Sequence, residues 1–216
     1  YVYKSNLSIV QSTFVMQNDA YLDGGGVSLE KVRKISIKNS YCISNSASFG
    51  GGLFFMTGIR LIVIENTTFV NNVAPENYGG GCYFQQILIC LIINSSFEYS
   101  FANYKGGALR SYRTSTVILL NSQFRRNIAG NWGGGVEIDT SEKCLISGTH
   151  FEINKATEGG SVCIAEFSSF KLFFCTFIRN IGFNRGGGLN IKYSKSIHTS
   201  VEITNCLFKA NTATQE

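Results

Sequence analysis

Residues 124–136, FRRNIAGNWGGGV, carry the pattern that decides the fold of this chain. An apolar anchor, Phe124, is followed after three residues by Asn127 and after two more by Ala129, before a glycine pair begins at Gly133. Similar glycine pairs occur throughout the 216 residues, at steps of 26 to 29, and begin at Gly24, Gly50, Gly79, Gly106, Gly133, Gly159 and Gly186. A constant period of this length is the signature of a repeat architecture.

The anchors keep the same period. The clearest further copies of F-x-x-N-x-A begin at Phe69, Phe151 and Phe208, and a close variant begins at Phe177. Phe97 precedes Ser100 instead of Asn, Cys42 takes the anchor place in one repeat, and Phe14 fits only with one extra residue before Ala20. We therefore expect seven full repeats and the start of an eighth.

Each repeat contains three short stretches in which apolar residues occupy every second position, such as Ile62 and Ile64 before an anchor or Cys82 and Phe84 after the glycines. This alternation predicts strands, and no window shows the periodicity of an amphipathic helix. One apolar stripe per strand is buried only when repeats stack. We expect an all-β, right-handed parallel β-helix, with about 27 residues per turn, as a single domain over residues 1–216.

The composition agrees with that fold and excludes several others. The chain has 23 glycines, which suit sharp corners, and one proline, which suits central strands because proline removes a ladder hydrogen bond. Its 44% hydrophobic residues exclude disorder, and its net charge of +5 is spread without a basic block, so we expect no nucleic-acid partner. The longest apolar run, residues 87–93, is too short to span a membrane. Because the chain begins at Tyr1 without a signal segment, we expect a piece of a longer protein that contacts membranes only through other parts.

The paired motifs F-x-x-N-x-A and G-G-[GA]-[LVI] resemble the repeats of polymorphic outer-membrane proteins, and more broadly the pectin-lyase-like superfamily of right-handed β-helices. The resemblance covers essentially the whole chain and implies an extracellular or cell-surface location. Departures are Ser100 for Asn, Cys42 for Phe and Ser161 for the third small residue of the glycine motif. Proteins of this fold include adhesins, polysaccharide-cleaving enzymes and scaffolds, so the resemblance leaves function open.

Stacked turns place equivalent residues about 4.8 Å apart. We expect one asparagine ladder inside the turns, formed by Asn45, Asn72, Asn127, Asn154, Asn180 and Asn211, and a second formed by Asn39, Asn66, Asn94 and Asn121. N-glycosylation sequons begin at Asn6, Asn66 and Asn94. Burial in the second ladder would exclude glycans at Asn66 and Asn94, which leaves Asn6 as the candidate acceptor.

Aromatic residues form the candidate binding surface. Phe49, Tyr78 and Trp132 directly precede glycine pairs, and Phe54 and Tyr83 should point outward on the following strand. These rings would offer a platform for sugar rings or a partner protein, or would pack on each other as a corner ladder. Charged columns, such as Glu98, Arg125 and Glu152, or Arg110 facing Glu137, are interpreted as surface pairs.

The seven cysteines form no complete disulfide framework. Cys42, Cys82, Cys90 and Cys144 occupy core positions, whereas Cys163 should point outward as a free thiol. Cys175 and Cys206 hold equivalent positions in neighbouring turns and are the candidate disulfide. No C-x-x-C motif is present, so neither zinc nor any other cofactor is predicted.

Hydrolases of this fold need clustered carboxylates, but Asp19, Asp23 and Asp139 are dispersed, and His198 stands alone in the long loop 192–200. We therefore expect no enzyme. The function expected is that of a structural or adhesive surface protein, which presents a rigid rod to other protein chains or to surface glycans. Two alternatives remain open: a carbohydrate-binding or polysaccharide-cleaving β-helix, and a subunit of an end-to-end extracellular assembly.

Overall fold

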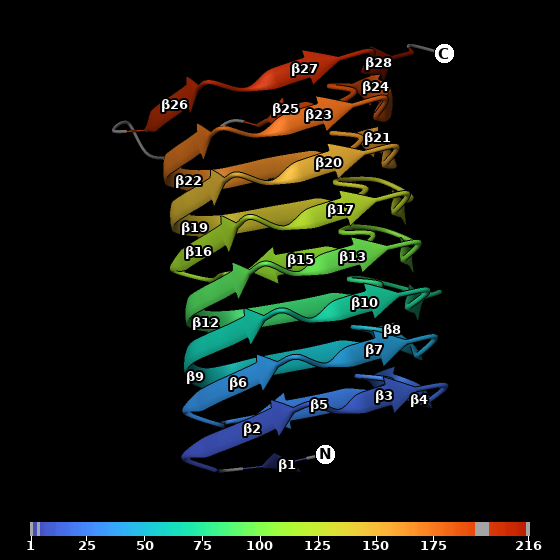
Figure 1. The fold of residues 1–216 in the computed structure, drawn as a ribbon, viewed down its shortest axis with the longest axis vertical. Coiled ribbons are helices and arrows are strands. Elements are labelled where there is room, and N and C mark those ends of the chain that lie inside the picture. The colour runs from blue at the N-terminus through green and yellow to red at the C-terminus, as the bar shows by residue number, and fades with distance from the viewer. Residues whose placement is uncertain (1, 4, 193–198, 215–216) are drawn as a thin grey trace.

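The computed structural model describes residues 2–3, 5–192 and 199–214. These residues form 28 strands and no helix. The chain winds as a right-handed coil, crossing the front of Figure 1 from left to right and returning behind while it rises from the N-terminus to the C-terminus. Residues in the same place in successive turns are typically 27 apart, and about seven turns stack. The sequence-based prediction of a right-handed parallel β-helix is confirmed.

Three parallel sheets run along the rod. The first has 12 strands and is bent. One part consists of β1 (Val2–Tyr3), β5 (Val27–Glu30), β9 (Leu53–Glu65), β12 (Cys82–Ile93), β15 (Leu109–Tyr112), β19 (Val136–Ser147), β22 (Val162–Phe173) and β25 (Leu189–Ile191). Beyond the bend it is completed by β2 (Leu7–Gln11), β6 (Lys34–Lys38), β16 (Thr116–Leu120) and β26 (Ser200–Thr204).

The other two sheets have eight short strands each. The second sheet contains β3 (Phe14–Met16), β7 (Tyr41–Ile43), β10 (Thr68–Val70), β13 (Ser96–Glu98), β17 (Gln123–Arg125), β20 (His150–Glu152), β23 (Thr176–Ile178) and β27 (Leu207–Lys209). The third contains β4 (Asp19–Asp23), β8 (Ser46–Phe49), β11 (Val73–Ala74), β14 (Phe101–Ala102), β18 (Ile128–Ala129), β21 (Lys155–Glu158), β24 (Ile181–Arg185) and β28 (Thr212–Ala213).

The strand pattern differs from three separate strands per repeat. In β9, β12, β19 and β22 the strand after the glycines continues around the bend into the strand before the next anchor. A residue with positive φ, such as Thr57 (47°) or Gln86 (57°), makes the bend. β9 has the extra residue Gly58 there, and the pairing of β9 with β12 shifts between Gln85 and Ile87.

The anchors stack through the centre of the rod. Phe69 and Phe97 have ring centroids 4.4 Å apart, Phe97 and Phe124 are 4.8 Å apart, and these rings are fully buried. The assignment of Phe14 as an anchor is wrong, because Val15 pairs with Cys42 while Phe14 points outward with 66% of its surface exposed. Val15, Asn18 and Ala20 fit the repeat motif without an insertion.

The first asparagine ladder is confirmed and is the polar counterpart of the phenylalanine stack. Each side-chain oxygen accepts hydrogen bonds from the backbone N–H and the amide of the asparagine one turn earlier, as Asn154 Oδ1 does from Asn127 at 3.0 Å in both cases. Each amide also donates to the carbonyl of the previous anchor, as Asn154 Nδ2 does to Phe124 O at 2.8 Å. Asn18 extends the ladder at one end, and Ser100 interrupts it.

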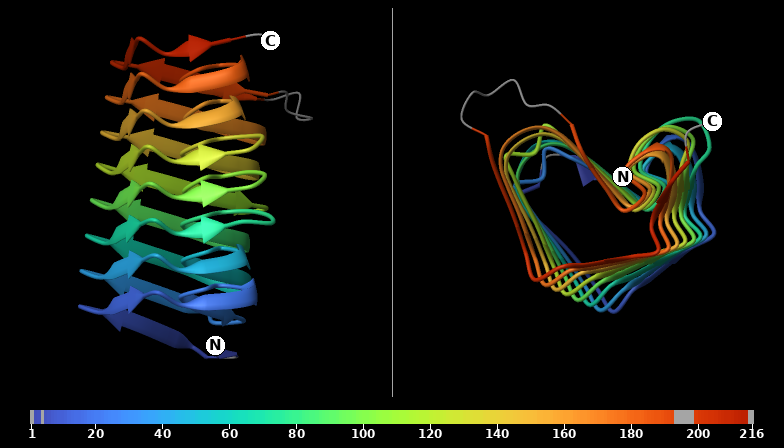
Figure 2. Two further views of the ribbon diagram at one scale, coloured as in Figure 1. Left: turned by 90° about the vertical axis from the view of Figure 1, so that its right-hand side faces the viewer. Right: turned by 90° about the horizontal axis from the view of Figure 1, so that it is seen from above.

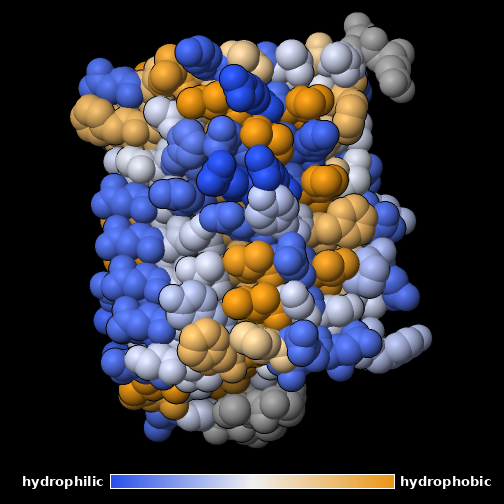
Figure 3. Space-filling view, turned by 45° about the vertical axis from the view of Figure 1, so that its right-hand side comes forward, coloured by the Kyte–Doolittle hydropathy of each residue, from blue (hydrophilic) through white to orange (hydrophobic). Residues whose placement is uncertain are grey.

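The glycine pairs form corners that a side chain would disrupt. Gly79 has a φ of +67°, and a Cβ on Gly80 would lie 2.3 Å from Phe101 O in the next turn. Seen from above in Figure 2, the turns superpose on one outline, which is indented where the third sheet leads back to the first. On the side where the second and third sheets come forward, hydrophobic and hydrophilic side chains are interspersed (Figure 3).

Candidate functional site

The aromatic residues expected to bind partners lie at the indentation of the outline. Phe49 contacts Tyr78 at a centroid distance of 5.7 Å, and Phe54 contacts Tyr83 at 5.4 Å. Rings from the two pairs also touch, with Tyr78 and Tyr83 at 5.9 Å. Phe54 and Tyr83 are each only 5% exposed, whereas Phe49 and Tyr78 are half-buried. The rings therefore pack on each other as a corner cluster, and partner binding through them stays a prediction.

The cluster continues into a buried ion pair. Arg110 Nε lies 3.1 Å from Glu137 Oε2, and the Arg110 guanidinium lies 3.8 Å from the centroid of the Tyr78 ring. The register that faces Arg110 with Glu137 is confirmed, but their interpretation as a surface pair is wrong, since they are 5% and 1% exposed. The corner before the glycines folds over this column. Burial raises the pKa of the Glu137 carboxyl to about 7, although Arg110 opposes that shift.

Trp132 lies farther along the same indentation and is half-buried. The ammonium groups of Lys105 and Lys192 each lie 3.5 Å from a ring centroid of Trp132. Lys192 is also 2.5 Å from Glu158 Oε2, which fixes its position. Because cation–π contacts already use this ring, a sugar that stacked on Trp132 would have to displace a lysine.

The cysteine predictions have mixed outcomes. Cys163 is a free thiol but is fully buried, and burial raises its pKa. Cys175 and Cys206 are stacked as expected, with the Cys175 N–H 3.4 Å from Cys206 Sγ. Both are free thiols in this structure. The disulfide between them therefore stays a prediction.

The sequon asparagines differ from expectation. Asn66 and Asn94 are exposed rather than buried, because they occupy corner positions with φ of 48° and 47°, outside the ladder of the core. Asn6 is exposed as well. All three side chains are accessible for N-glycosylation, so the argument against Asn66 and Asn94 is wrong. His198 lies outside the described residues.

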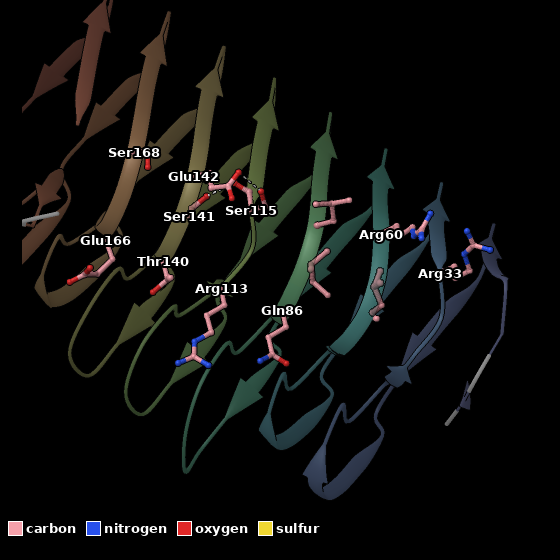
Figure 4. Close-up of a pocket in the computed structure, with 14 residues that line it drawn as sticks. Arg33, Arg60, Gln86, Arg113, Ser115, Thr140, Ser141, Glu142, Glu166 and Ser168 are labelled. Carbon is pink, nitrogen blue, oxygen red and sulfur yellow. Dashed lines mark hydrogen bonds between the residues drawn. The ribbon is translucent and has the colours of Figure 1, made fainter. Parts of the chain in front are cut away.

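Sequence reasoning missed a groove along the outside of the bend in the first sheet. It has a volume of about 950 Å³ and crosses six turns, from Arg33 to Ser168. Arg33 and Arg60 lie toward one end, while Glu142 and Glu166 come from later turns (Figure 4). Glu142 Oε2 accepts a hydrogen bond from Ser115 Oγ at 2.8 Å. The sequence did contain a signal for this groove, since its lining residues recur at the period of the turns, at positions 33, 60, 88, 115, 142 and 168.

The chemistry of these sites is polar contact and packing. In the described ranges, no group of three or more His, Cys, Asp or Glu side chains could hold a metal ion. The described part of the chain also has no helix able to cross a membrane. Asp19 and Asp23 both lie on β4, so the expectation that the three aspartates are dispersed over different turns is wrong for this pair, whereas Asp139 lies on β19 in another turn.

Comparison with known proteins gives one partial similarity. Over 125 residues, the chain is 38% identical to a protein of Dictyostelium discoideum named metabotropic glutamate receptor-like protein R. The matched stretch is 57% of this chain but only 7% of that relative. No family model matches the chain. No solved structure shows a significant match.

Proposed function

We propose that this chain is a non-catalytic, rigid segment of a larger extracellular or cell-surface protein, in which it presents side faces to other protein chains or glycans. The observation that carries the proposal is the unbroken core. The phenylalanine stack passes through consecutive turns from Phe69 to Phe208 at centroid spacings of 4.4 to 5.2 Å. Such a core fills the interior of these turns and favours a role for the outer surface.

The relative's name supports a receptor-like context, but this chain spans too little of that protein to transfer its activity. We also propose that the chain belongs to the pectin-lyase-like superfamily and carries repeats of the polymorphic outer-membrane type. The motif pair and the right-handed parallel coil support this assignment.

A glycan array probed with the labelled 216-residue chain, together with an assay for reducing ends released from polysaccharides, tests the proposal. We expect no reducing ends. Release of reducing ends would contradict the non-catalytic role. Glycan binding that is lost in Trp132→Ala but kept in Asn184→Ala, a change at an exposed residue, would favour the carbohydrate-binding alternative.

The end-to-end alternative stays a prediction, and the length of the particles in solution tests it. Filaments whose length grows with protein concentration would support assembly, whereas rods of a single length would count against it.

A further inference from the structure

The outer face of the first sheet beyond the bend is apolar over four consecutive turns. Val63, Leu91, Ile118 and Leu145 stack as direct neighbours and are all partly exposed. Ile93 and Leu120 form a second such pair beside them. We call these six residues the apolar face. A solvent-exposed sheet face is normally polar, and contiguous exposed apolar residues mark contact surfaces.

The central and second columns of the apolar face are symmetric along the rod, whereas the outward column nearest the bend, Leu61, Ile89, Thr116 and Lys143, is apolar only in its first two turns. In the central column, the apolar residues are bounded by Ser36 at one end and Lys171 at the other. In the second column, Ile93 and Leu120 are bounded by Glu65 and Ser147. Both columns therefore have their midpoint between β12 and β16.

In the column at the bend beside the face, two opposite charges have the same midpoint. The register places Arg60, Leu88, Ser115 and Glu142 in successive turns of one column. Arg60 and Glu142 are equally far from the midpoint, in opposite directions. Figure 4 shows them on different turns along the bend, with Ser115 hydrogen-bonded to Glu142.

We propose that the apolar face binds a second copy of this chain, in a dimer whose rods lie side by side and antiparallel. The two-fold axis runs along the strands, between β12 and β16. That axis places Leu91 against the partner's Ile118, Val63 against the partner's Leu145, and Arg60 against the partner's Glu142. Each contact occurs twice, as an isologous interface requires, and the two sheets pack face to face about 10 Å apart.

Charge complementarity favours this arrangement over parallel rods. A two-fold axis along the rod would bring Lys34 against the partner's Lys38, since these residues lie on either side of the central column in one turn. Like charges brought together across an interface are unfavourable. The antiparallel dimer instead places Lys34 against the partner's Ser169.

Sedimentation velocity over a concentration series tests the proposal, with protein produced in bacteria and therefore without N-glycans. We expect a monomer–dimer equilibrium. Leu91→Lys should raise the dimer Kd by at least about 100-fold, because the change occurs twice in a desolvated contact. The matched control is Ile128→Lys, in which a 41% exposed residue on the third sheet is replaced and the Kd should stay unchanged.

A charge exchange tests the antiparallel geometry. Arg60→Glu alone and Glu142→Arg alone should each raise the Kd by about 10-fold, and the double variant should restore it. Circular dichroism verifies that each variant is folded. Four results would each overturn the proposal. The chain stays monomeric at about 1 mM, or Ile128→Lys weakens the dimer as much as Leu91→Lys does. Alternatively, the double charge variant does not recover the parent Kd, or assemblies larger than a dimer persist in Leu91→Lys.

Discussion

Asn154 gives the sharpest test of how the turns are held together. Its side chain is fully buried. It accepts hydrogen bonds from the N–H and the amide of Asn127, both at 3.0 Å, and donates to Phe124 O at 2.8 Å and to Asn180 Oδ1 at 3.1 Å. Asn154 Nδ2 also donates to Ser161 Oγ at 3.2 Å, so Asn154→Ala removes five bonds and leaves the Asn127 N–H buried without its acceptor.

At about 1 kcal/mol of net stability per hydrogen bond, Asn154→Ala should lower the free energy of unfolding by about 5 kcal/mol. The assay is urea denaturation, in which the loss appears as a lower midpoint at an unchanged m-value. Amide hydrogen exchange gives a local measurement, and the Asn127 N–H should lose protection. Asn184→Ala, at an exposed position, should change stability by no more than about 0.5 kcal/mol.

Asn154→Asp distinguishes the hydrogen bonds that this side chain accepts from those that it donates. The carboxylate still accepts from Asn127, but it faces Phe124 O and Asn180 Oδ1, to which it has no proton to donate. Burial raises the pKa of such a carboxyl, so the variant should gain stability as the pH falls and the group becomes protonated. A loss of stability in Asn154→Ala no larger than in Asn184→Ala would contradict the role of the ladder. So would a stability of Asn154→Asp, relative to the parent chain, that does not change with pH.

Three further predictions concern the buried residues Ser100, Phe124 and Glu137. Ser100→Asn should raise the free energy of unfolding by about 1–2 kcal/mol in urea denaturation, because it restores the ladder. The new side chain would lie beside Gly81, as Asn72 lies beside Gly52, and an unchanged or lower midpoint would contradict this. Phe124→Ala should cost about 3–5 kcal/mol in the same assay by opening a cavity in the ring stack, and a loss below about 1 kcal/mol would exclude a continuous stack. Burial raises the folded-state pKa of Glu137 to about 7 from the ordinary value of 4.5, so the folded chain binds more protons between these values. Stability should therefore fall as the pH rises from about 4.5 to 7, and a slope that is the same in Glu137→Gln would contradict the assignment.

Much of the fold could be predicted from the repeat period, because each residue type that recurs has one role in the local geometry of a turn. Gly79 has positive φ, Phe124 fills the core, and Asn127 saturates the backbone of the turn, so each marker has one structural role. The assignment failed at Phe14, where a large aromatic residue stands next to the true anchor, Val15. Hydrophobicity alone does not say which of two neighbouring apolar residues points inward.

The exposure of surface side chains was harder to predict, because the alternation of apolar and polar residues along a strand shows only whether a side chain points into the core or away from it. Phe54, Arg110 and Glu137 leave the core and are nevertheless buried, since the corner before the glycines folds over them. Asn66 repeats with the period of the turns and is nevertheless exposed, because its corner projects into solvent. The first outcome depends on how the third sheet meets the first, and the second on how the first sheet leads into the second, and neither angle is encoded in a two-residue pattern.

In the sequence, the apolar face is indicated only by strands that are unusually apolar, such as residues 87–93. A parallel strand buried on both faces has the same appearance. Only the register shows that Leu91 and Ile118 lie on the outside of the rod and stack directly. The same register gives the midpoint from which the antiparallel dimer follows.

Nuclear Overhauser contacts between backbone protons test the central claim, the stacking of parallel turns at a period of about 27 residues. Parallel stacking at this period gives contacts that link the neighbourhood of Leu91 to that of Ile118, and that of Ile118 to that of Leu145, with both strands running in the same direction. Contacts that instead pair strands adjacent in sequence in antiparallel hairpins would contradict it.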